Sequence, residues 1–433
     1  MIPRYSRTEM TNVWSDNHKF QTWLQVEVAA TQGWAKEGIV PEIDAELIAN
    51  NATVNPENVI TYIEETHHDV TAFIRSVTES LGEEGRWIHY GLTSSDVWDT
   101  ATSLQCLDAL RLIESGLADL EAAVRKQATA HMHTLCIGRT HGIHAEPTTF
   151  GMKLAVWLTE LKRHSERLEL AKRQIGIGQL SGPVGTHASV PPVVEEIACN
   201  YLGLEVADAT TQILQRDRHA FLINCIAGLA GTLEKFATEL RNLQRTEVAE
   251  VEEPFTENAQ TGSSSMPHKR NPELSERVCG IARTLRGYAV TANENIALWH
   301  ERDISHSGAE RIILPDAFGL LDYALYILTG VIEGLNVKTD RMQENLHLTR
   351  GLIFSSKALN ALITAGMTRQ DAYKIVQVAA MKSHGERLDF REQLETHQEV
   401  DELLTKEQIN DIFNPQSYLN YVDVTFKRIG LIE

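Results

Sequence analysis

The sequence predicts an all-α protein that consists of three helical domains with a long central helical bundle. Apolar side chains recur at helical spacing along most of the 433 residues, whereas the alternation typical of strands is scarce. Several periodic segments extend over about 25 residues, which corresponds to helices near 40 Å long. Helices of this length bury their apolar faces against one another, so we expect a bundle.

Four long helices are expected in the central part of the chain. The first covers residues 150–175, where Leu154, Trp157 and Leu161 share one face and Gly176 ends the helix. The other three are expected over residues 218–247, from residue 273 to about residue 299, and over 309–335 with an interruption at Pro315.

The domain boundaries follow from helix-start signals and from a change in character near the C-terminus. Residues 93–96, Thr-Ser-Ser-Asp, form a helix-start cluster, and a charge-rich amphipathic tail begins after residues 336–339. We therefore predict an N-terminal domain over residues 1–93, a central bundle over 94–341 and a C-terminal domain over 342–433.

Charge restricts the class of partner. The formal net charge of -19 argues against a general binder of nucleic acid or of membrane surfaces. An anionic substrate would therefore need cations gathered locally. The candidates are the cations that stand in unusual motifs: Arg4, Lys269, Arg270, Arg302 and Arg311.

Cysteine usage and the N-terminus indicate a cytoplasmic protein. The five cysteines are scattered and include no Cys-x-x-Cys pair, as expected for reduced thiols. The first residues lack the apolar core of a signal peptide, and the apolar stretch at residues 221–233 is too short to span a bilayer. We therefore expect neither export nor membrane insertion.

The run GSSSMPHKRNP at residues 262–272 is the most distinctive segment. Gly262 and three serines make its first part flexible and rich in donors, and Pro272 favours entry into the helix that follows. Lys269 and Arg270 provide charge for an anionic ligand. An ordinary polar surface connection is the alternative.

Two histidine-containing blocks are further candidates. Residues 66–69, Thr-His-His-Asp, place two imidazoles beside a carboxylate, although such a block is more often a polar helix face. Residues 138–147 carry His141 and His144 between a Gly and a Pro, which favours a turn that presents His141. A zinc site at His141 and His144 is a weaker alternative, because no His-Glu-x-x-His motif or Cys pair accompanies them.

These blocks together resemble a known family. The loop at residues 262–272 resembles the signature loop of the fumarase/aspartase superfamily, which predicts a fumarase/aspartase-like fold. Residues 66–70, 90–96 and 138–147 resemble the corresponding blocks of the adenylosuccinate lyase family, in the same order along the chain. Carboxymuconate cycloisomerases carry a similar signature loop but lack the histidine equivalent to His141, so His141 favours adenylosuccinate lyase.

The resemblance implies a reaction and its catalytic residues. It implies β-elimination of fumarate from adenylosuccinate, giving AMP, and from succinylaminoimidazole carboxamide ribotide, giving the carboxamide ribotide, as in purine biosynthesis. It implies no cofactor and no metal ion. Ser263 is expected as the general base, with Lys269 favouring its alkoxide, and His141 as the general acid. His68 is expected to assist on the substrate side, and Glu276 to orient His141.

The resemblance also implies a substrate-binding set and an assembly. The implied binding residues are Arg4, Tyr5, His67, His68, Asp69, Thr93, Ser94, Gln212, Ser264, Lys269, Asn271, Arg302, Ser307 and Arg311. On a helix, Ser307 and Arg311 would share one face, whereas Arg302 is expected on irregular backbone. Blocks this far apart in sequence fit a homotetramer in which different subunits contribute to each site.

Two other readings predict different behaviour. A helical scaffold, whose polar blocks only connect helices, would show no turnover and would tolerate substitution of His141 and Ser263. Argininosuccinate lyase and fumarase are alternatives within the superfamily, disfavoured by Arg270 after Lys269 and by the histidine-rich blocks.

Overall fold

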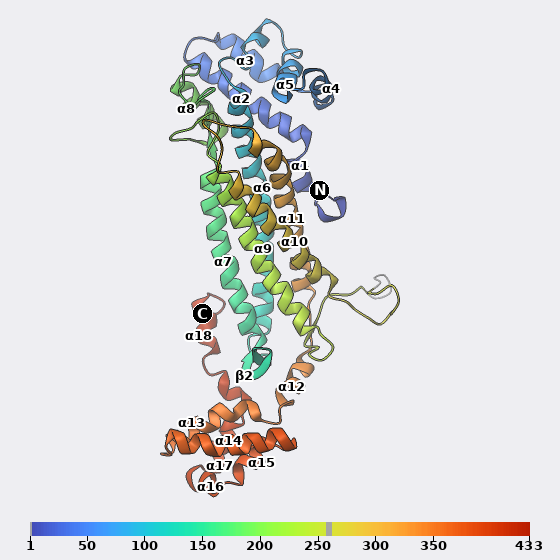
Figure 1. The fold of residues 1–433 in the computed structure, drawn as a ribbon, viewed down its shortest axis with the longest axis vertical. Helices are drawn as coiled ribbons and strands as arrows, with labels where there is room; N and C mark the ends of the chain where they lie inside the picture. The colour runs from blue at the N-terminus through green and yellow to red at the C-terminus, as the bar shows by residue number, and fades with distance from the viewer. Residues whose placement is uncertain (1, 257–261) are drawn as a thin grey trace. The chain divides into compact units, whose positions relative to one another are not determined.

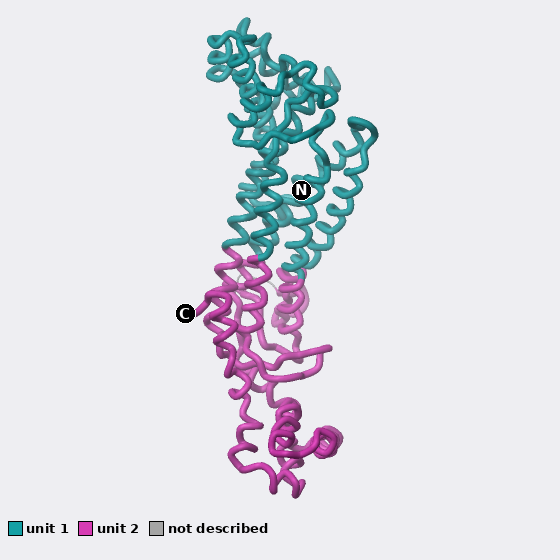
Figure 2. The backbone as a smooth tube through the Cα atoms, turned by 90° about the vertical axis from the view of Figure 1, so that its left-hand side faces the viewer, with its two compact units in different colours: residues 1–118, 163–234, 277–327 teal, residues 119–162, 235–276, 328–433 magenta. Residues whose placement is uncertain are grey.

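The computed structural model describes residues 2–256 and 262–433 and is dominated by helices (Figure 1). The all-α prediction is confirmed, with short strand pairs added between helices. The chain divides into two compact units, coloured separately in Figure 2. The three-domain division stays a prediction.

The first unit contains residues 1–118, 163–234 and 277–327. Its shorter elements are η1 (Pro3–Tyr5), α1 (Thr8–Val13), α2 (Asp16–Lys36), α3 (Glu42–Asn51), α4 (Pro56–Thr66), α5 (Asp69–Thr78), η2 (Glu83–Trp87), β3 (Ile177–Gly178), α8 (Pro192–Leu202) and β4 (Glu205–Val206). Helix α2 begins where the Ser15 side chain accepts a hydrogen bond from the His18 amide. Phe20 and Trp23 of α2 pack against Phe73 of α5 in a core whose ring centroids lie 5.4–6.4 Å apart.

Five long helices make up most of the central part of the chain. They are α6 (Ser94–Ala130), α7 (Phe150–Ile175), α9 (Asp217–Leu243), α10 (Glu273–Glu294) and α11 (Ser305–Glu333). The prediction for α7 is confirmed at both ends, and α6 begins inside the predicted helix-start cluster. The predicted ends of α9 and α10 were several residues too late.

The predicted interruption at Pro315 is wrong, because α11 continues through it. Proline removes one backbone donor from a helix interior. The residues on either side are anchored, since Leu314 and Ala317 are buried. Packing of this face therefore holds the helix together across the missing hydrogen bond.

The second unit contains residues 119–162, 235–276 and 328–433. Its shorter elements are β1 (Leu135–Thr140), β2 (Ile143–Thr149), β5 (Val251–Glu252), β6 (Asn336–Val337), α12 (Thr339–His347), η3 (Leu352–Phe354), α13 (Ser355–Thr364), α14 (Arg369–Glu386), α15 (Phe390–Glu395), α16 (Gln398–Leu403), α17 (Lys406–Ile412), η4 (Pro415–Tyr418) and α18 (Val422–Arg428). Its core joins Ile137 of β1 to Leu346 of α12 and to Phe354 and Phe390. Trp157 of α7 stacks on Phe236 of α9, with centroids 4.3 Å apart.

The hairpin formed by β1 and β2 was expected only as a turn. Thr140 pairs with Ile143, which leaves His141 and Gly142 as a two-residue connection. Both have left-handed backbone, with φ of 57° and 78°, as tight hairpin turns require. The turn was predictable because Gly accepts this conformation at no steric cost, whereas the short strands gave no clear alternating pattern.

Helices α9 and α11 are long and apolar enough to span a membrane by length and composition. Their apolar windows are longer than the stretch at residues 221–233. In each helix 61% of the window is buried within the protein. This burial is what the core helices of a bundle require.

The five cysteines are buried. Burial raises the pKa of the Cys136 and Cys199 thiols to about 12. These thiols therefore stay protonated near neutral pH and pack as small apolar side chains.

Candidate active site

The histidine pair at residues 67 and 68 lies in the short connection between α4 and α5. His67 ends α4 with left-handed backbone at φ 52°, and His68 precedes α5. Nδ1 of His68 accepts a hydrogen bond from the Thr71 amide at 3.3 Å, so neutral His68 carries its proton on Nε2. Half of the His68 side chain is exposed. The pair is therefore part of a helix junction, not a regular helix face.

Asp69 connects this junction to α11. Arg311 donates from Nη2 to Asp69 Oδ2 at 2.7 Å and from Nε to Ser307 Oγ at 3.4 Å. The Arg311 guanidinium also lies 3.9 Å from the ring centroid of Trp98 in α6. The expected shared face of Ser307 and Arg311 is thus confirmed, and contacts from α5, α6 and α11 converge on one cation.

Gln212 and Arg302 meet in the same unit, although each lies outside the long helices. Arg302 donates from Nη1 to Gln212 Oε1 at 2.9 Å. The irregular segment expected around Arg302 is present between α10 and α11, where His300 has a φ of 50°. The guanidinium of Arg302 is partly buried, and burial lowers its pKa.

Thr93 and Ser94 stand at the N-terminus of α6, where Asp96 organises the backbone. Its Oδ2 accepts a hydrogen bond from the Thr93 amide at 2.8 Å, and Oδ1 accepts one from Ser181 at 3.1 Å. Burial of Asp96 raises its pKa to about 7, against these hydrogen bonds. Asp96 thus joins the Thr93 block to the segment at Ser181.

Arg4 and Tyr5 lie in the short η1 turn at the start of the chain. The Tyr5 ring lies 5.5 Å from the Tyr323 ring and beneath Arg277, whose guanidinium is 5.5 Å from the Tyr5 centroid. Tyr5 also lines a cavity of about 550 Å³ together with Arg277 and Asp316. The turn is thus packed on α10 and α11.

In the second unit, His141 stands at the tip of the β1–β2 hairpin, where its side chain is exposed. Arg139, two residues earlier, donates to both oxygens of Glu250 at 2.6 and 3.1 Å. Glu250 is buried and also accepts from Asn345 at 2.7 Å. This charge-assisted network anchors β1 just before the tip of the hairpin and leaves the imidazole of His141 exposed.

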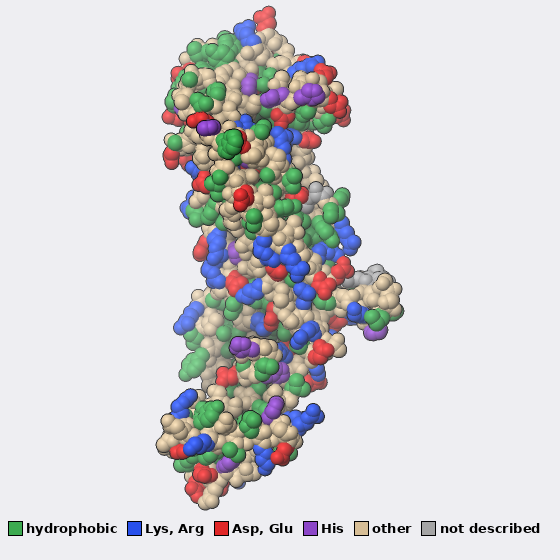
Figure 3. Space-filling view, viewed as in Figure 1, with side chains coloured by type: hydrophobic (Ala, Val, Ile, Leu, Met, Phe, Trp, Pro, Cys, Tyr) green, Lys and Arg blue, Asp and Glu red, His purple; other side chains and the backbone are tan. Residues whose placement is uncertain are grey.

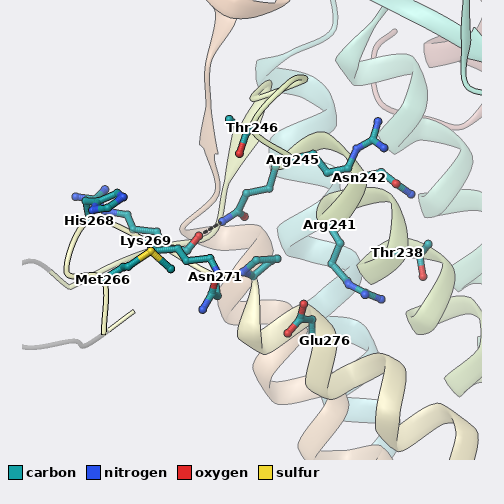
Figure 4. A pocket seen from close by; sticks show the side chains of 13 residues that line it. Thr238, Arg241, Asn242, Arg245, Thr246, Met266, His268, Lys269, Asn271 and Glu276 are labelled. Atoms are coloured by element: carbon teal, nitrogen blue, oxygen red, sulfur yellow. Dashed lines mark hydrogen bonds between the residues drawn. The ribbon is translucent and has the colours of Figure 1, made fainter. Parts of the chain in front are cut away.

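The loop at residues 262–272 borders a cationic cavity of about 760 Å³ (Figure 4). Lys269, Asn271 and Glu276 line it together with Arg241 and Arg245 at the end of α9. Lys, Arg and His side chains are visible on this projecting loop in the space-filling view (Figure 3). The cations among these residues suit a ligand that carries several carboxylate or phosphate oxygens.

The two ends of this loop are in close contact. Asn271 donates from Nδ2 to the Gly262 carbonyl at 2.9 Å. A Cβ at Gly262 would lie 2.4 Å from the Lys269 carbonyl, so only glycine allows this approach. Ser263 Oγ accepts from the Met266 amide at 3.2 Å. Ser263 and Ser264 are not among the loop residues that line the cavity; the lining begins at Met266.

The structure therefore groups the predicted site residues into sets. In the first unit, Asp69, Ser307 and Arg311 form one set, and Gln212 and Arg302 a second. In the second unit, Lys269, Asn271 and Glu276 share the cavity, which His141 does not line. The orientation of His141 by Glu276 stays a prediction.

Sequence reasoning missed several residues beside these sets. Arg241 and Arg245 line the cavity, and the buried Arg216 binds both Asp99 and Glu310. Charged residues that recur inside an apolar helical face, as Asp99 and Glu310 do, could have indicated a buried ion pair. Among the described residues, no group of three or more His, Cys, Asp or Glu is placed to hold a metal ion.

Comparisons with known proteins agree on the family. A family model described as "Lyase" matches residues 4–287, and one described as "Adenylosuccinate lyase C-terminus" matches residues 351–429. The adenylosuccinate lyase of Staphylococcus saprophyticus is 49% identical over 431 residues, which cover 100% of both chains.

Solved structures of related enzymes have the same fold. A fumarate lyase from a Mesorhizobium species superposes with a TM-score of 0.90 at 29% identity, covering 98% of each chain. The β-carboxy-cis,cis-muconate cycloisomerase of Acinetobacter calcoaceticus superposes with a TM-score of 0.88 at 26% identity, covering 98% of this chain and 97% of that one. These matches confirm the fumarase/aspartase-like fold. The full-length identity and the C-terminal family model decide between the members of this superfamily, and the chain belongs to the adenylosuccinate lyase family.

Proposed function

We propose that the adenylosuccinate lyase activity of this chain is a β-elimination on two succinyl-purine nucleotides. Adenylosuccinate would give AMP and fumarate, and succinylaminoimidazole carboxamide ribotide would give its carboxamide and fumarate. The observation that carries this assignment is the full-length identity of 49% to an adenylosuccinate lyase. The cationic cavity beside the signature loop supports it, because the substrates carry phosphate and carboxylate groups.

The proton is removed first from the carbon next to a succinyl carboxylate. Ser263 takes this proton, and the electron pair left on carbon is delocalised into the carboxylate as a doubly charged aci form. The build-up of this second negative charge accounts for most of the activation energy, so cations close to the carboxylate lower the energy of the transition state. Lys269 suits this role because it lines the cavity and lies on the same loop.

The carbon–nitrogen bond then breaks. The carbon electron pair forms the double bond of fumarate, and the pair of the broken bond moves to the departing nitrogen, which takes a proton from His141. Histidine suits this task because its ordinary pKa lies close to working pH. The exposed position of His141 on an anchored hairpin supports a role toward a ligand outside its own strand pair.

Substrate binding is assigned to the sets described above. Arg302, Ser307 and Arg311 suit the oxygens of phosphate and carboxylate, and His68 offers its Nε2 proton on the substrate side. Arg4, Tyr5, His67, Asp69, Thr93, Ser94, Gln212, Ser264, Lys269 and Asn271 complete the proposed binding residues. The reaction as written moves two protons and breaks the carbon–nitrogen bond with no net oxidation or reduction, so the proposal includes no cofactor.

We assign these sets to sites shared between the subunits of a cytoplasmic homotetramer. Large apolar side chains on the outside of the long helices support association: Val290 is 63% exposed, Ile312 59% and Tyr326 58%. A mixture of the Ser263→Ala and His141→Asn proteins tests this assembly. Shared sites predict that activity returns on mixing, since some sites then contain both native residues, whereas sites built within one chain predict none.

The first experiment is fumarate release by the purified protein given adenylosuccinate, with and without a metal chelator. Equal release in both samples is expected and would support the metal-free chemistry. A protein that released no fumarate would contradict the proposal. The same assay with carboxymuconate and argininosuccinate would then test the other superfamily reactions.

A further inference from the structure

A buried cluster of charges lies beside the Gln212–Arg302 pair in the first unit. Arg216 donates to both oxygens of Asp99 at 2.6 and 2.8 Å, and to both oxygens of Glu310 at 3.0 and 3.1 Å. The three side chains are 2%, 1% and 6% exposed. Arg216 precedes α9, Asp99 belongs to α6 and Glu310 to α11, so one guanidinium connects three segments of the chain.

Stability by itself explains this cluster poorly. Removing three charged groups from water is costly, and apolar residues of similar volume often stabilise a core equally well. Two neighbouring histidines contribute no further charge. Burial and the positive charge of Arg216 lower the pKa of His219 to about 3 and of His306 to about 4. Burial raises the pKa of Glu310 to about 7, against the pull of Arg216, so this carboxyl is only partly ionised near neutral pH. The cluster therefore holds the Arg216 cation between the Asp99 carboxylate and the Glu310 carboxyl.

The cluster also contacts the backbone of Leu214, two residues after Gln212. Asp99 accepts a hydrogen bond from the Leu214 amide at 2.9 Å, and Arg216 donates to the Leu214 carbonyl at 2.7 Å. Gln179 donates to the Gln212 carbonyl at 2.8 Å. Residues 212–216 are thus held from both sides, which directs the Gln212 side chain to its contact with Arg302.

The cluster also acts on Arg302 through charge. Arg302 Nε is buried without a hydrogen-bond partner. Asp99 and Glu310, together with Asp69, are carboxyl groups nearby that favour the charged form of Arg302. Glu310 lies one residue before Arg311 and three after Ser307 on α11. The cluster therefore lies against the first turns of α11, which carry the proposed anion-binding residues.

We propose that Arg216, with Asp99 and Glu310, is a positioning group that holds Gln212, Arg302 and the first turn of α11 in their substrate-binding arrangement. The inference rests on the proposed function, since it assigns a cause to the geometry of that same site. None of the three residues needs to touch the substrate. They act by fixing the residues that do, so their loss should affect binding more than the chemical step.

The test compares Glu310→Gln with Glu114→Gln. Glutamine keeps the shape of Glu310 but loses its charge and one of the two contacts to Arg216. Glu114 is a matched control because it pairs with Lys172 at 2.9 Å between α6 and α7 in the same unit. We expect Glu310→Gln to raise the KM for adenylosuccinate about tenfold with kcat within about threefold of the native value. The control should change neither constant.

Two further measurements distinguish a loss of positioning from a loss of folding, and they test the positioning role without relying on the proposed activity. Arg216→Lys keeps the charge but cannot form the paired hydrogen bonds, so it should also raise KM while the protein stays folded. Amide hydrogen exchange needs no substrate. Residues 210–214 and 299–307 should exchange about fivefold faster in Glu310→Gln than in the native protein or the control.

An unchanged KM in folded Glu310→Gln would overturn the inference, as would a fall in kcat with KM unchanged. Unaltered exchange at residues 210–214 and 299–307 would overturn it independently of any activity. If the native protein released no fumarate, the proposed function would fail, and the exchange result would still decide whether the cluster positions these segments.

Discussion

Arg311 and Asp69 form an ion pair at 2.7 Å although they lie 242 residues apart in the chain. The pair joins α11 to the junction that carries His67 and His68. Neither residue is deeply buried, so the pair is worth little as a source of stability. The pair instead orients the guanidinium of Arg311, which also contacts Ser307 and Trp98.

Asp69→Asn should therefore impair substrate binding more than stability. The amide cannot hold the guanidinium by charge, so we expect the KM for adenylosuccinate to rise about tenfold, with a small change in melting temperature. Steady-state kinetics and thermal unfolding measure the two effects. Glu65→Gln is the control, because Glu65 pairs with Arg75 at the same 2.7 Å on the neighbouring helices. Equal KM values in the two variants would count against the role of the Asp69–Arg311 pair.

His141→Asn should abolish most of the turnover. Asparagine tolerates the left-handed backbone of the hairpin turn but cannot donate a proton as an imidazolium does. We expect kcat to fall about 10²- to 10³-fold with an unchanged circular dichroism spectrum. His133→Asn, at an exposed histidine of the same unit, should retain full activity. A His141→Asn protein with native kcat would exclude His141 as the general acid.

Ser263→Ala tests the general base. Without the hydroxyl no group of the loop can take the substrate proton in the proposed way, so kcat should fall about 10³-fold. The substitution also removes the acceptor of the Met266 amide, a local effect that Ser265→Ala does not share. Ser265→Ala should remain active. Substrate binding measured by calorimetry should persist in the inactive variant, and native turnover in Ser263→Ala would refute the assignment.

The buried His219 should make the protein sensitive to acid. Its pKa is lowered to about 3 by burial and by the positive charge of Arg216. The unfolded chain gains a proton near pH 6.5, whereas the folded protein does so only near pH 3. The contribution of His219 to stability is therefore fully present above pH 6.5, and this contribution falls by about 1.4 kcal/mol per pH unit as the pH drops from about 6.5 toward 3.

His219→Phe should remove this contribution. The free energy of unfolding, measured with urea between pH 7 and pH 4, should depend less steeply on pH than in the native protein. The difference in slope should correspond to about one proton fewer taken up on unfolding. His384→Phe, at an exposed histidine, is the control and should leave the dependence unchanged. Parallel pH curves for the native protein and His219→Phe would show that His219 is not the group responsible.

The sequence by itself determined the helical class and the family. Helical periodicity is a local property, so the bounds of α7 and the starts of α6 and α10 could be predicted closely. The signature loop and the histidine blocks are contiguous in sequence, and they identified the family correctly. The turn at His141 and Gly142 could likewise be predicted, because the left-handed backbone that it requires depends on the local residue types, above all on Gly142.

Only the tertiary structure decided which distant side chains meet. The partners of Arg311 and Arg216 come from helices that are far apart in sequence, and no local pattern specifies them. Packing also overrode a local signal at Pro315, where buried neighbours carry α11 through a residue that usually ends a helix. Periodicity reports which face of a helix is buried, whereas the contacts across that face depend on every other helix that packs against it.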